Sequence, residues 1–416
     1  MAGATRLAAA PAPERVVFLL GLGTAVSLLG DSTLYTVLPR PEIAAQAGVS
    51  LAAVGVLLGA NRAVRMLTNG LVGLLYDRLP RQRLLTIALA LGALSTLLFA
   101  VGYGPAPLLL SRLLWGTAWS GIWVGCNAVV LDVAAADSRG RLSGQYQMWF
   151  FAGTGGAALL GGLLTDLAGF RPALLIGGGA TLLAALLWAR LLPDLDAGAV
   201  MHLTLPAAAR PASRFPWSAT LAAAAPMFVT RFVFAGVTSA TVILWLGNLV
   251  GEGLALGRLA LPLATLAGAF AALRALVSVA GARLAGHLAD RTGRRWQTTA
   301  AVLLAGAGGV WLAAGQGAAV AAAGALAAAV AAGGVQALVP VLVGDHGQPA
   351  LRGRMLSVVY TLSDLGSAIG PPLALGLLAW LPLGAIYRLC AGLLGAAALL
   401  ALWQTRRDAE RAAEPP

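Results

Sequence analysis

The chain has 416 residues, of which 59% are hydrophobic and 11% are charged, whereas soluble domains carry about 25% charged residues. This composition excludes an ordinary soluble protein, and apolar runs of about 20 residues, long enough to cross a bilayer, recur along the sequence. The net charge of +12 comes from arginine without any lysine. Because most of these arginines fall in short loops, we expect them to orient the chain in the membrane and expect no nucleic-acid partner.

Apolar length, interrupted by Gly, Pro and charged residues, predicts twelve membrane-spanning helices. In chain order they are expected at 16–38, 52–75, 84–101, 108–132, 143–166, 172–192, 219–247, 259–285, 297–315, 318–343, 355–380 and 385–403. A polar connector follows the sixth span. The expected organisation is therefore an N-terminal six-helix half (1–192), a connector (193–217) and a C-terminal six-helix half (218–416).

An even number of spans places both termini on one side of the membrane. The loops on that side carry most of the loop arginines, namely Arg78, Arg81, Arg83, Arg139, Arg141, Arg210, Arg214, Arg291, Arg294, Arg295, Arg352 and Arg354. The opposite loops carry only Arg40, Arg171, Arg258 and, near a helix end, Arg388. Positively charged loops stay in the cytoplasm. We therefore expect cytoplasmic termini in a multi-pass protein of a bacterial inner membrane.

The two halves share an internal repeat at one constant offset. Gly73 and Gly286 are 213 positions apart, and the same offset relates Asp132 to Asp345. It also relates the Arg-Gly-Arg triplets at 139–141 and 352–354. Repeats of the same orientation, related by an axis along the membrane normal, place a substrate site at their interface near the middle of the membrane.

The loop at Gly286 to Arg295 fits the pattern G-x-x-x-D-R-x-G-R-R and resembles the corresponding loop of the major facilitator superfamily. The first copy departs from the pattern at Pro80 and Gln82. The residues of this candidate gate motif are Gly73, Asp77, Arg78, Arg81, Gly286, Asp290, Arg291, Gly293 and Arg294. The resemblance implies an all-α membrane protein of two pseudo-repeated six-helix bundles that transports and is not an enzyme. The motif charges either latch one face shut or serve only as topology anchors.

Two further patterns carry the resemblance. Arg112 and Gly116 in the fourth span fit the family's R-x-x-x-G motif. The fifth span partly fits G-x-x-x-G-P-x-x-G-G, found in proton-coupled drug exporters of the family: Gly153, Gly161 and Gly162 match, while alanines replace the central Gly-Pro. Glycines at this spacing let helices approach closely, so packing alone explains them as well as gating does.

Ionisable residues inside the spans are candidates for function because burying charge in lipid is costly. Asp31 and Arg112 lie at similar depth, which predicts a pair, and the resemblance to exporters implies that this pair couples transport to protons. The alternative is a static pair that fixes packing. Arg231 and Asp364 also lie at similar depth and are predicted to pair.

The middle of the membrane is expected to be rich in arginine. Asn61, Arg62 and Arg65 form a polar stripe on the second span, and the repeat offset carries Asn61 to Arg274. Five embedded arginines against two aspartates favour an anionic or zwitterionic substrate. The candidate cavity residues are Asn61, Arg62, Arg65, Trp115, Trp119, Tyr146, Arg231, Arg274, Gln336 and Tyr360. The tryptophans, which recur every four residues with Trp123, fit equally a core or lipid-facing stripe.

These features favour a secondary active transporter that exports small amphipathic molecules in exchange for protons. The alternative is a proton-coupled uptake permease for an organic anion. A receptor or enzyme on the same scaffold ranks lower, since the sequence contains no nucleophile-base arrangement, metal-ligand spacing or phosphate-binding loop. The expected partners are a small-molecule substrate, protons and the bilayer, with no cofactor or metal, and the expected oligomeric state is a monomer.

Overall fold

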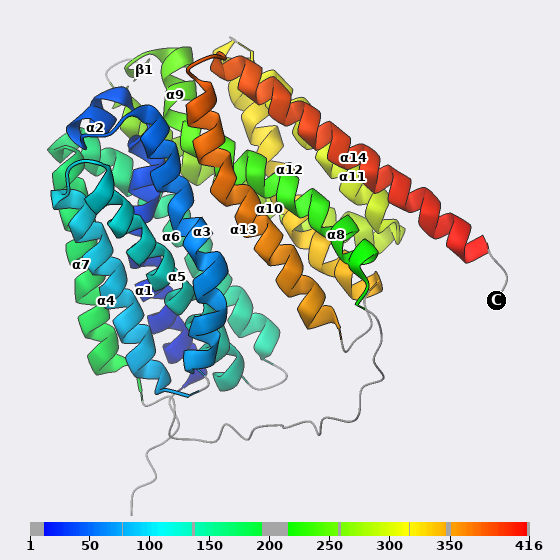
Figure 1. Ribbon diagram of the computed structural model, residues 1–416, viewed down its shortest axis with the longest axis horizontal. Helices are drawn as coiled ribbons and strands as arrows, with labels where there is room; N and C mark the ends of the chain where they lie inside the picture. Colours follow the sequence, from blue (N-terminus) through cyan, green and yellow to red (C-terminus); the bar gives the residue numbers. More distant parts are fainter. Residues whose placement is uncertain are drawn as a thin grey trace, which may run out of the picture.

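The computed structural model describes residues 12–76, 78–134, 138–193, 215–256, 259–315, 317–346 and 351–413. Within these ranges the chain forms two helical bundles, which Figure 1 shows side by side. The first bundle contains α1 (Pro13–Val37), α2 (Pro41–Gln46), α3 (Leu51–Tyr76), α4 (Arg81–Val101), α5 (Pro105–Val133), α6 (Arg139–Ala168) and α7 (Phe170–Leu191). All of these except the short α2 are long enough to cross a membrane.

The second bundle begins with a composite helix made of α8 (Trp217–Thr230), the π-helical segment η1 (Arg231–Thr238) and α9 (Ser239–Val250). It continues with the antiparallel strands β1 (Gly253–Leu256) and β2 (Leu259–Pro262). The remaining helices are α10 (Leu263–Thr292), α11 (Arg295–Ala313), α12 (Ala318–His346), α13 (Arg352–Leu377) and α14 (Leu383–Ala413). A π-helical segment inside a long helix frequently marks a functional site.

The predicted spans coincide with these helices in the described part of the chain. Ten of the segments are long and apolar enough to count as membrane spans on their own, and α11 and α13, with 19 and 26 residues, add two more of crossing length. The eighth span was predicted to begin at 259, which is wrong, because β2 occupies this position and α10 begins only after Pro262. Proline is favoured at a helix start and has no amide hydrogen for a helix interior.

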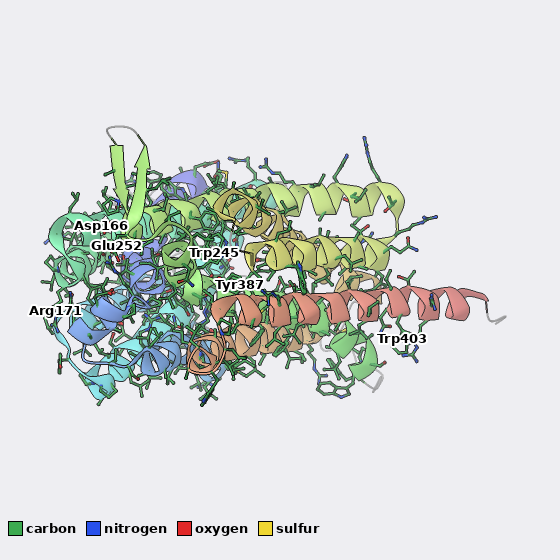
Figure 2. The ribbon with its side chains drawn as sticks, turned by 90° about the horizontal axis from the view of Figure 1, so that it is seen from above. Asp166, Arg171, Trp245, Glu252, Tyr387 and Trp403 are labelled. Atoms are coloured by element: carbon green, nitrogen blue, oxygen red, sulfur yellow. The ribbon has the colours of Figure 1, made fainter. Side chains whose placement is uncertain are left out.

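We call the end where α1 begins and α14 ends the termini side, and the opposite end, which carries α2 and the β1–β2 hairpin, the far side. Figure 2, which looks onto the far side, shows the hairpin projecting beyond the bundles. In Figure 1 the two bundles lie together at the far side and diverge toward the termini side. The chain therefore adopts a state that is closed at one face.

Two helix pairs join the bundles, α3 with α13 and α6 with α10. At the far side these helices touch backbone to backbone: Gly59 lies against the carbonyl oxygen of Ala368, and Gly162 lies against that of Ala264. A side chain at either glycine would force the helices apart, so small residues permit the contact. The far-side halves of the two pairs therefore form a closed seam between the bundles.

The same helices lose these contacts toward the termini side. Along α3, Gly59 lies against α13, whereas a Cβ at Gly70 would meet open space. Along α10, Gly268 lies against α6, whereas a Cβ at Gly286 would meet open space. The close contacts described between these helices therefore end before the termini side, where Figure 1 shows the bundles apart.

Candidate functional site

A buried ion pair lies inside the first bundle, as the sequence predicts. Asp31 Oδ1 on α1 accepts hydrogen bonds from Arg112 Nη2 on α5 at 2.5 Å and from Asn61 Nδ2 on α3 at 3.2 Å. Arg112 Nε donates to the carbonyl oxygen of Leu57 at 3.2 Å. The Arg112 side chain is only 2% exposed and that of Asp31 is 16% exposed. This cluster confirms the predicted pairing and holds three helices together.

Local packing explains how Arg112 reaches Asp31. Gly116, one helical turn after Arg112, lies against the carbonyl oxygen of Asn61. The absence of a side chain at Gly116 lets α5 approach α3, so that the Arg112 side chain extends between α3 and α1. The R-x-x-x-G spacing therefore has a physical role in this chain, because the glycine brings the helices close and the arginine fills the space beside it.

A second ion pair crosses between the bundles. Arg65 Nη2 on α3 lies 3.0 Å from both carboxylate oxygens of Asp364 on α13. The predicted pairing of Asp364 with Arg231 is wrong: Arg231 Nε instead donates to Ser363 Oγ at 3.3 Å. Both α3 and η1 pack on α13, and Arg65 reaches the carboxylate from α3 while Arg231 reaches the neighbouring Ser363 from η1. The bridge lies near the middle of α3 and α13, where the far-side seam ends.

Arg62 lies beside this bridge and faces α1. Its Nε donates to Tyr35 Oη at 2.9 Å, and its guanidinium carbon lies 5.2 Å from the centre of the Tyr35 ring. Tyr35 Oη in turn donates to the carbonyl oxygen of Leu58 at 2.6 Å. Tyr35 was not predicted from the sequence, although a phenol one helical turn after Asp31 on the same helix was a usable signal.

The arginines at this level outnumber the acids. Asp364 balances Arg65, but Arg62 and Arg231 form no ion pair within the described part of the chain. The predicted positive surplus is therefore present at the interface of the bundles. Together Arg62, Arg65, Arg231, Asp364 and Ser363 form what we call the seam cluster.

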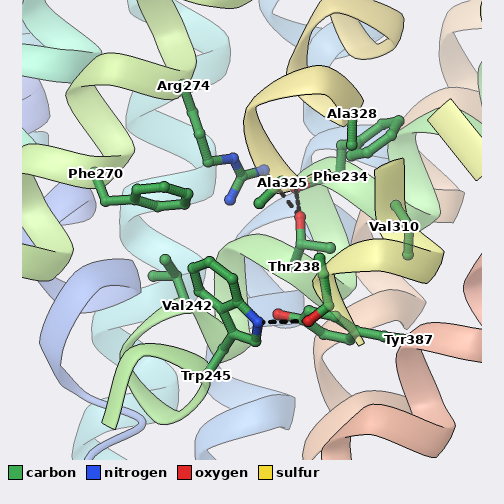
Figure 3. Close-up of a pocket in the computed structure, with 11 residues that line it drawn as sticks. Phe234, Thr238, Val242, Trp245, Phe270, Arg274, Val310, Ala325, Ala328 and Tyr387 are labelled. Atoms are coloured by element: carbon green, nitrogen blue, oxygen red, sulfur yellow. Dashed lines mark hydrogen bonds between the residues drawn. The ribbon is translucent and has the colours of Figure 1, made fainter. Parts of the chain in front are cut away.

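Arg274 lies apart from the seam cluster, in a pocket inside the second bundle (Figure 3). Its Nη2 donates to Thr238 Oγ1 at 2.9 Å. The other walls are mainly aromatic and aliphatic, including Trp245, Phe270 and Tyr387. Arg274 is therefore not part of the seam cluster.

Several predicted cavity residues lie elsewhere. Trp115 and Trp119 are buried in the core of the first bundle, where their rings stack with centroids 6.0 Å apart. Tyr146 is fully buried there too, with its hydroxyl 3.2 Å from Thr24 Oγ1. The alternative of a core stripe is thus the observed one for these aromatic residues. Gln336 and Tyr360 are exposed side chains of the second bundle.

The loop motif forms pairs within each half instead of across the halves. Arg81 pairs with Asp132, and Arg295 Nε lies 2.9 Å from Asp345 Oδ2. The two aspartates are repeat mates. Asp290, Arg291 and Arg294 are exposed, as is Arg78.

The glycines of the motif fit this open arrangement. Gly293 has a φ of 65°, a left-handed conformation that ends α10, and a Cβ at Gly73 or Gly286 would meet open space. Asp77 lies outside the described residues. The predicted latch is accordingly not formed by the described motif residues in this state, in which the termini side is parted.

Polar contacts that were not predicted from the sequence close the far side. Asp166 Oδ2 at the end of α6 accepts hydrogen bonds from the amide and the hydroxyl of Thr265, both at 2.6 Å, and so caps the start of α10. Arg40 Nη2 lies 2.5 Å from Glu252 Oε2 beside the hairpin. Figure 2 shows Asp166 and Glu252 together at this face. No local pattern pointed to these partners, which come from opposite halves.

The described residues contain no group of three His, Cys, Asp or Glu side chains placed to bind a metal ion. What the geometry offers is a set of embedded carboxylates held by guanidinium groups. Such carboxylates can exchange a proton, and the associated change of charge can alter which helices stay together.

The sequence profile of the Major Facilitator Superfamily matches residues 20–281 and 264–416. Among curated relatives, the "Quinolone resistance protein NorA" of Staphylococcus aureus strain MRSA252 is 25% identical over 163 residues, and that of strain N315 is 24% identical over 163 residues. The matched segment is 38% of this chain and 40% of each relative. The similarity therefore covers well under half of the relatives' length.

Solved structures match nearly the whole chain at low identity. A bacterial homolog of the human lysosomal transporter Spinster, in an inward-facing and occupied conformation, has a TM-score of 0.73 and 18% identity, with 96% of each chain covered. A POT family transporter in complex with a thioalcohol conjugated peptide has a TM-score of 0.74 and 11% identity, covering 94% of this chain and 96% of its own. These matches concern the fold. The profile match over both halves shows that the chain belongs to the Major Facilitator Superfamily, a family of membrane transporters.

Proposed function

We propose that this transporter exports small amphipathic molecules in exchange for protons, by alternating access around the seam cluster. The observation that carries the proposal is the Asp31–Arg112 pair, an acid and a base at 2.5 Å inside the first bundle. An embedded acid of this kind is costly and serves naturally as a proton carrier. The partial similarity to proteins named for quinolone resistance supports drug efflux.

Protonation of Asp31 acts on three helices at once. The neutral acid no longer attracts Arg112 as a charge, so α1 and α5 lose the contact that orders them. Removing one partner of a buried pair costs about 3–5 kcal/mol. Moving a two-state equilibrium from 1:99 to 99:1 requires about 5.5 kcal/mol. A proton at Asp31 therefore supplies most of this free energy when one state keeps the pair and the other breaks it.

This bias between the two states acts at the seam cluster, where one ion pair joins the two bundles. Asp364 on the second bundle is held by Arg65 on the first, at the point where the closed far side meets the parted termini side. Loss of charge on Asp364 loosens this joint, so Asp364 is the second proton-coupling residue. If the termini are cytoplasmic, the observed state is open to the cytoplasm, where an exporter in a bacterial inner membrane loads its substrate. We take the working unit to be a monomer.

Proton-coupled uptake of an organic anion is the alternative function. It is favoured by Arg62 and Arg231, which form no ion pair within the described residues. A carboxylate or phosphate substrate would supply the missing charge through bidentate contacts. Exporter and permease differ in the direction of substrate movement relative to protons.

The proposal is tested with purified protein in liposomes loaded with a pH-sensitive dye. A fluoroquinolone, which combines a carboxylate, an amine and an apolar ring system, is added outside. Wild-type protein should change the internal pH when this substrate is added, and Asp31→Asn should reduce the change at least tenfold. Glu42→Gln removes an exposed carboxylate on the far side and should behave as wild type. Unchanged proton movement in Asp31→Asn would refute the role of Asp31.

A further inference from the structure

A surface hollow lies on the second bundle where α8 and α13 begin, and both helices begin at the termini side in Figure 1. It measures about 220 Å³ and is lined by Phe215, Trp217, Arg354, Ser357 and Val358. A single ordered water needs only about 10–15 Å³ of such space, so the hollow has room for a group of several atoms. Trp217, Arg354 and Ser357 are exposed, so the hollow is open to its surroundings.

The internal repeat shows which chemistry belongs at this position. Arg354 on α13 is the repeat mate of Arg141 on α6, 213 positions earlier. In the first bundle, Arg141 Nη2 lies 2.8 Å from Glu14 Oε1 at the start of α1. In the second bundle α8 takes the place of α1, since it packs on α13 as α1 packs on α6. An acid at the start of α8 would therefore be the equivalent partner of Arg354.

The second bundle lacks this acid. The chain contains no aspartate or glutamate between Asp196 and Glu252, a stretch that includes the whole of α8. Arg354 forms no ion pair within the described ranges, and its guanidinium carbon lies 5.2 Å from the centre of the Phe215 ring. A ring face attracts the charge but offers no oxygen acceptor to the five N–H donors of a guanidinium. An anion from outside the chain can therefore take the place that Glu14 has in the first bundle.

The surroundings of Arg354 favour a membrane lipid as the source of this anion. Trp217 is 58% exposed and begins a membrane span, and tryptophan at the end of a span lies at the level of the lipid headgroups. Phe215 and Val358 add apolar walls beside the charge, from which a free phosphate ion would gain nothing. The termini side also carries most of the loop arginines, and basic pockets between membrane helices bind anionic headgroups.

We propose that this hollow, which we call the headgroup site, binds the phosphate of an anionic membrane lipid such as phosphatidylglycerol. The phosphate pairs with the Arg354 guanidinium and accepts a hydrogen bond from the Ser357 hydroxyl, three residues further along α13. The glycerol and the first part of the acyl chains lie against Trp217 and Val358. A lipid held here joins α8 to α13 as the pair of Glu14 and Arg141 joins α1 to α6.

The headgroup site lies outside the seam cluster and the Asp31–Arg112 pair. Its occupation needs neither proton coupling nor a particular direction of transport. Failure of this proposal therefore leaves the proposed function intact, and the reverse also holds.

The test titrates the purified full-length protein in neutral detergent with phosphatidylglycerol and measures the bound lipid by native mass spectrometry. Phosphatidylcholine with the same acyl chains keeps the phosphate but has no net charge, and inorganic phosphate supplies the anion without the lipid. We expect the first phosphatidylglycerol to bind at least fivefold more tightly than phosphatidylcholine. Inorganic phosphate in large excess should not displace it.

Two arginine variants locate the binding. Arg354→Gln removes an exposed side chain and should weaken binding of the first phosphatidylglycerol at least fivefold. Arg141→Gln removes the repeat mate, whose charge Glu14 already balances, and should leave the affinity within about twofold. Thermal unfolding of both variants checks that they are folded.

A second pair of variants supplies the missing acid. Ser357→Glu places a carboxylate three residues from Arg354, within reach for an ion pair on one helix face, and should remove the preference for phosphatidylglycerol. Ser357→Gln adds nearly the same volume without the charge and should keep that preference. Equal binding of the two lipids by the wild type, displacement by inorganic phosphate, or an unchanged affinity in Arg354→Gln would each overturn the proposal. Equal losses in Arg354→Gln and Arg141→Gln, or in the two Ser357 variants, would overturn it as well.

Discussion

The interiors of the two bundles use equivalent positions in opposite ways. In the first bundle, Asn61 and Arg112 surround Asp31, and the space is filled and the charge balanced. In the second bundle, Arg274 stands in the place of Asn61, and alanine stands in the place of Arg112, so a small cavity remains beside a guanidinium that forms no ion pair within the described residues. The duplicated loops differ less: each half has an arginine–aspartate pair with an equivalent aspartate, although Arg295 is the repeat mate of Gln82 and not of Arg81. The two halves therefore share one helical scaffold but differ in their buried polar and charged residues.

This contrast can be tested most strongly by removing Arg112 of the first bundle and Arg274 of the second bundle in turn. Arg112→Met leaves the Asp31 carboxylate buried without its cation and should destabilise the protein by about 3 kcal/mol. Arg274→Met removes a charge that has no ionic partner in the described residues, so stability should stay the same or rise. Both values come from thermal unfolding in detergent, followed by tryptophan fluorescence. Equal losses in the two variants would contradict the contrast.

The Arg65–Asp364 bridge between the halves is tested next, and its loss should have an intermediate effect on the closure of the far side. Asp364→Asn removes the bridge to Arg65 and should open the far-side seam more often, by roughly tenfold for a loss of about 1.4 kcal/mol. The readout is labelling of a cysteine placed at the buried Val54 with a membrane-impermeant maleimide. The protein for this experiment carries alanine in place of Cys126 and Cys390.

A neighbouring substitution controls for general loosening of α13. Ser363→Ala removes the hydroxyl that Arg231 contacts but leaves the bridge intact, and labelling should change by less than about twofold. The interpretation of the bridge as the joint fails if Ser363→Ala and Asp364→Asn increase labelling equally.

The smallest effect is expected at the exposed rim of the far side. Arg40→Gln removes the contact to Glu252, whose side chain is 84% exposed. Exposed pairs contribute little and are screened by salt. Labelling at Val54→Cys should rise by less than about threefold at low salt, and the rise should disappear at high salt. A large, salt-independent rise would show that this pair, and not the mid-membrane bridge, holds the halves together.

The sequence predicted what depends on long apolar runs and on spacing. The twelve predicted spans, the repeat and the Asp31–Arg112 pair followed from such signals. A helix must be long enough to cross the lipid, and a charge embedded in lipid needs a partner. The β1–β2 hairpin was not predicted, because the apolar residues of β2 were assigned to the start of the eighth span. The partner of Asp364 was not predicted for a different reason. Similar depth shows which charges can meet, but the choice between Arg65 and Arg231 depends on how the helices pack.

The pocket shows the limit most clearly. Ala325 and Ala328 line the pocket and belong to α12, a helix so rich in alanine that neither residue stands out in the sequence. They become informative only because the repeat places them at the positions equivalent to Arg112 and Trp115. Likewise, the stacked tryptophans of the first bundle could not be assigned to core or cavity until the packing of α5 was known.

The most direct test of the central claim follows a fluoroquinolone in proteoliposomes under an imposed pH gradient. Exchange with protons predicts accumulation in an acidic lumen, above that of protein-free vesicles, and movement in the opposite direction when the gradient is reversed. Asp31→Asn should lose the response to both gradients. Movement of the substrate in the same direction as the protons, or a gradient response that survives in Asp31→Asn, would contradict the account.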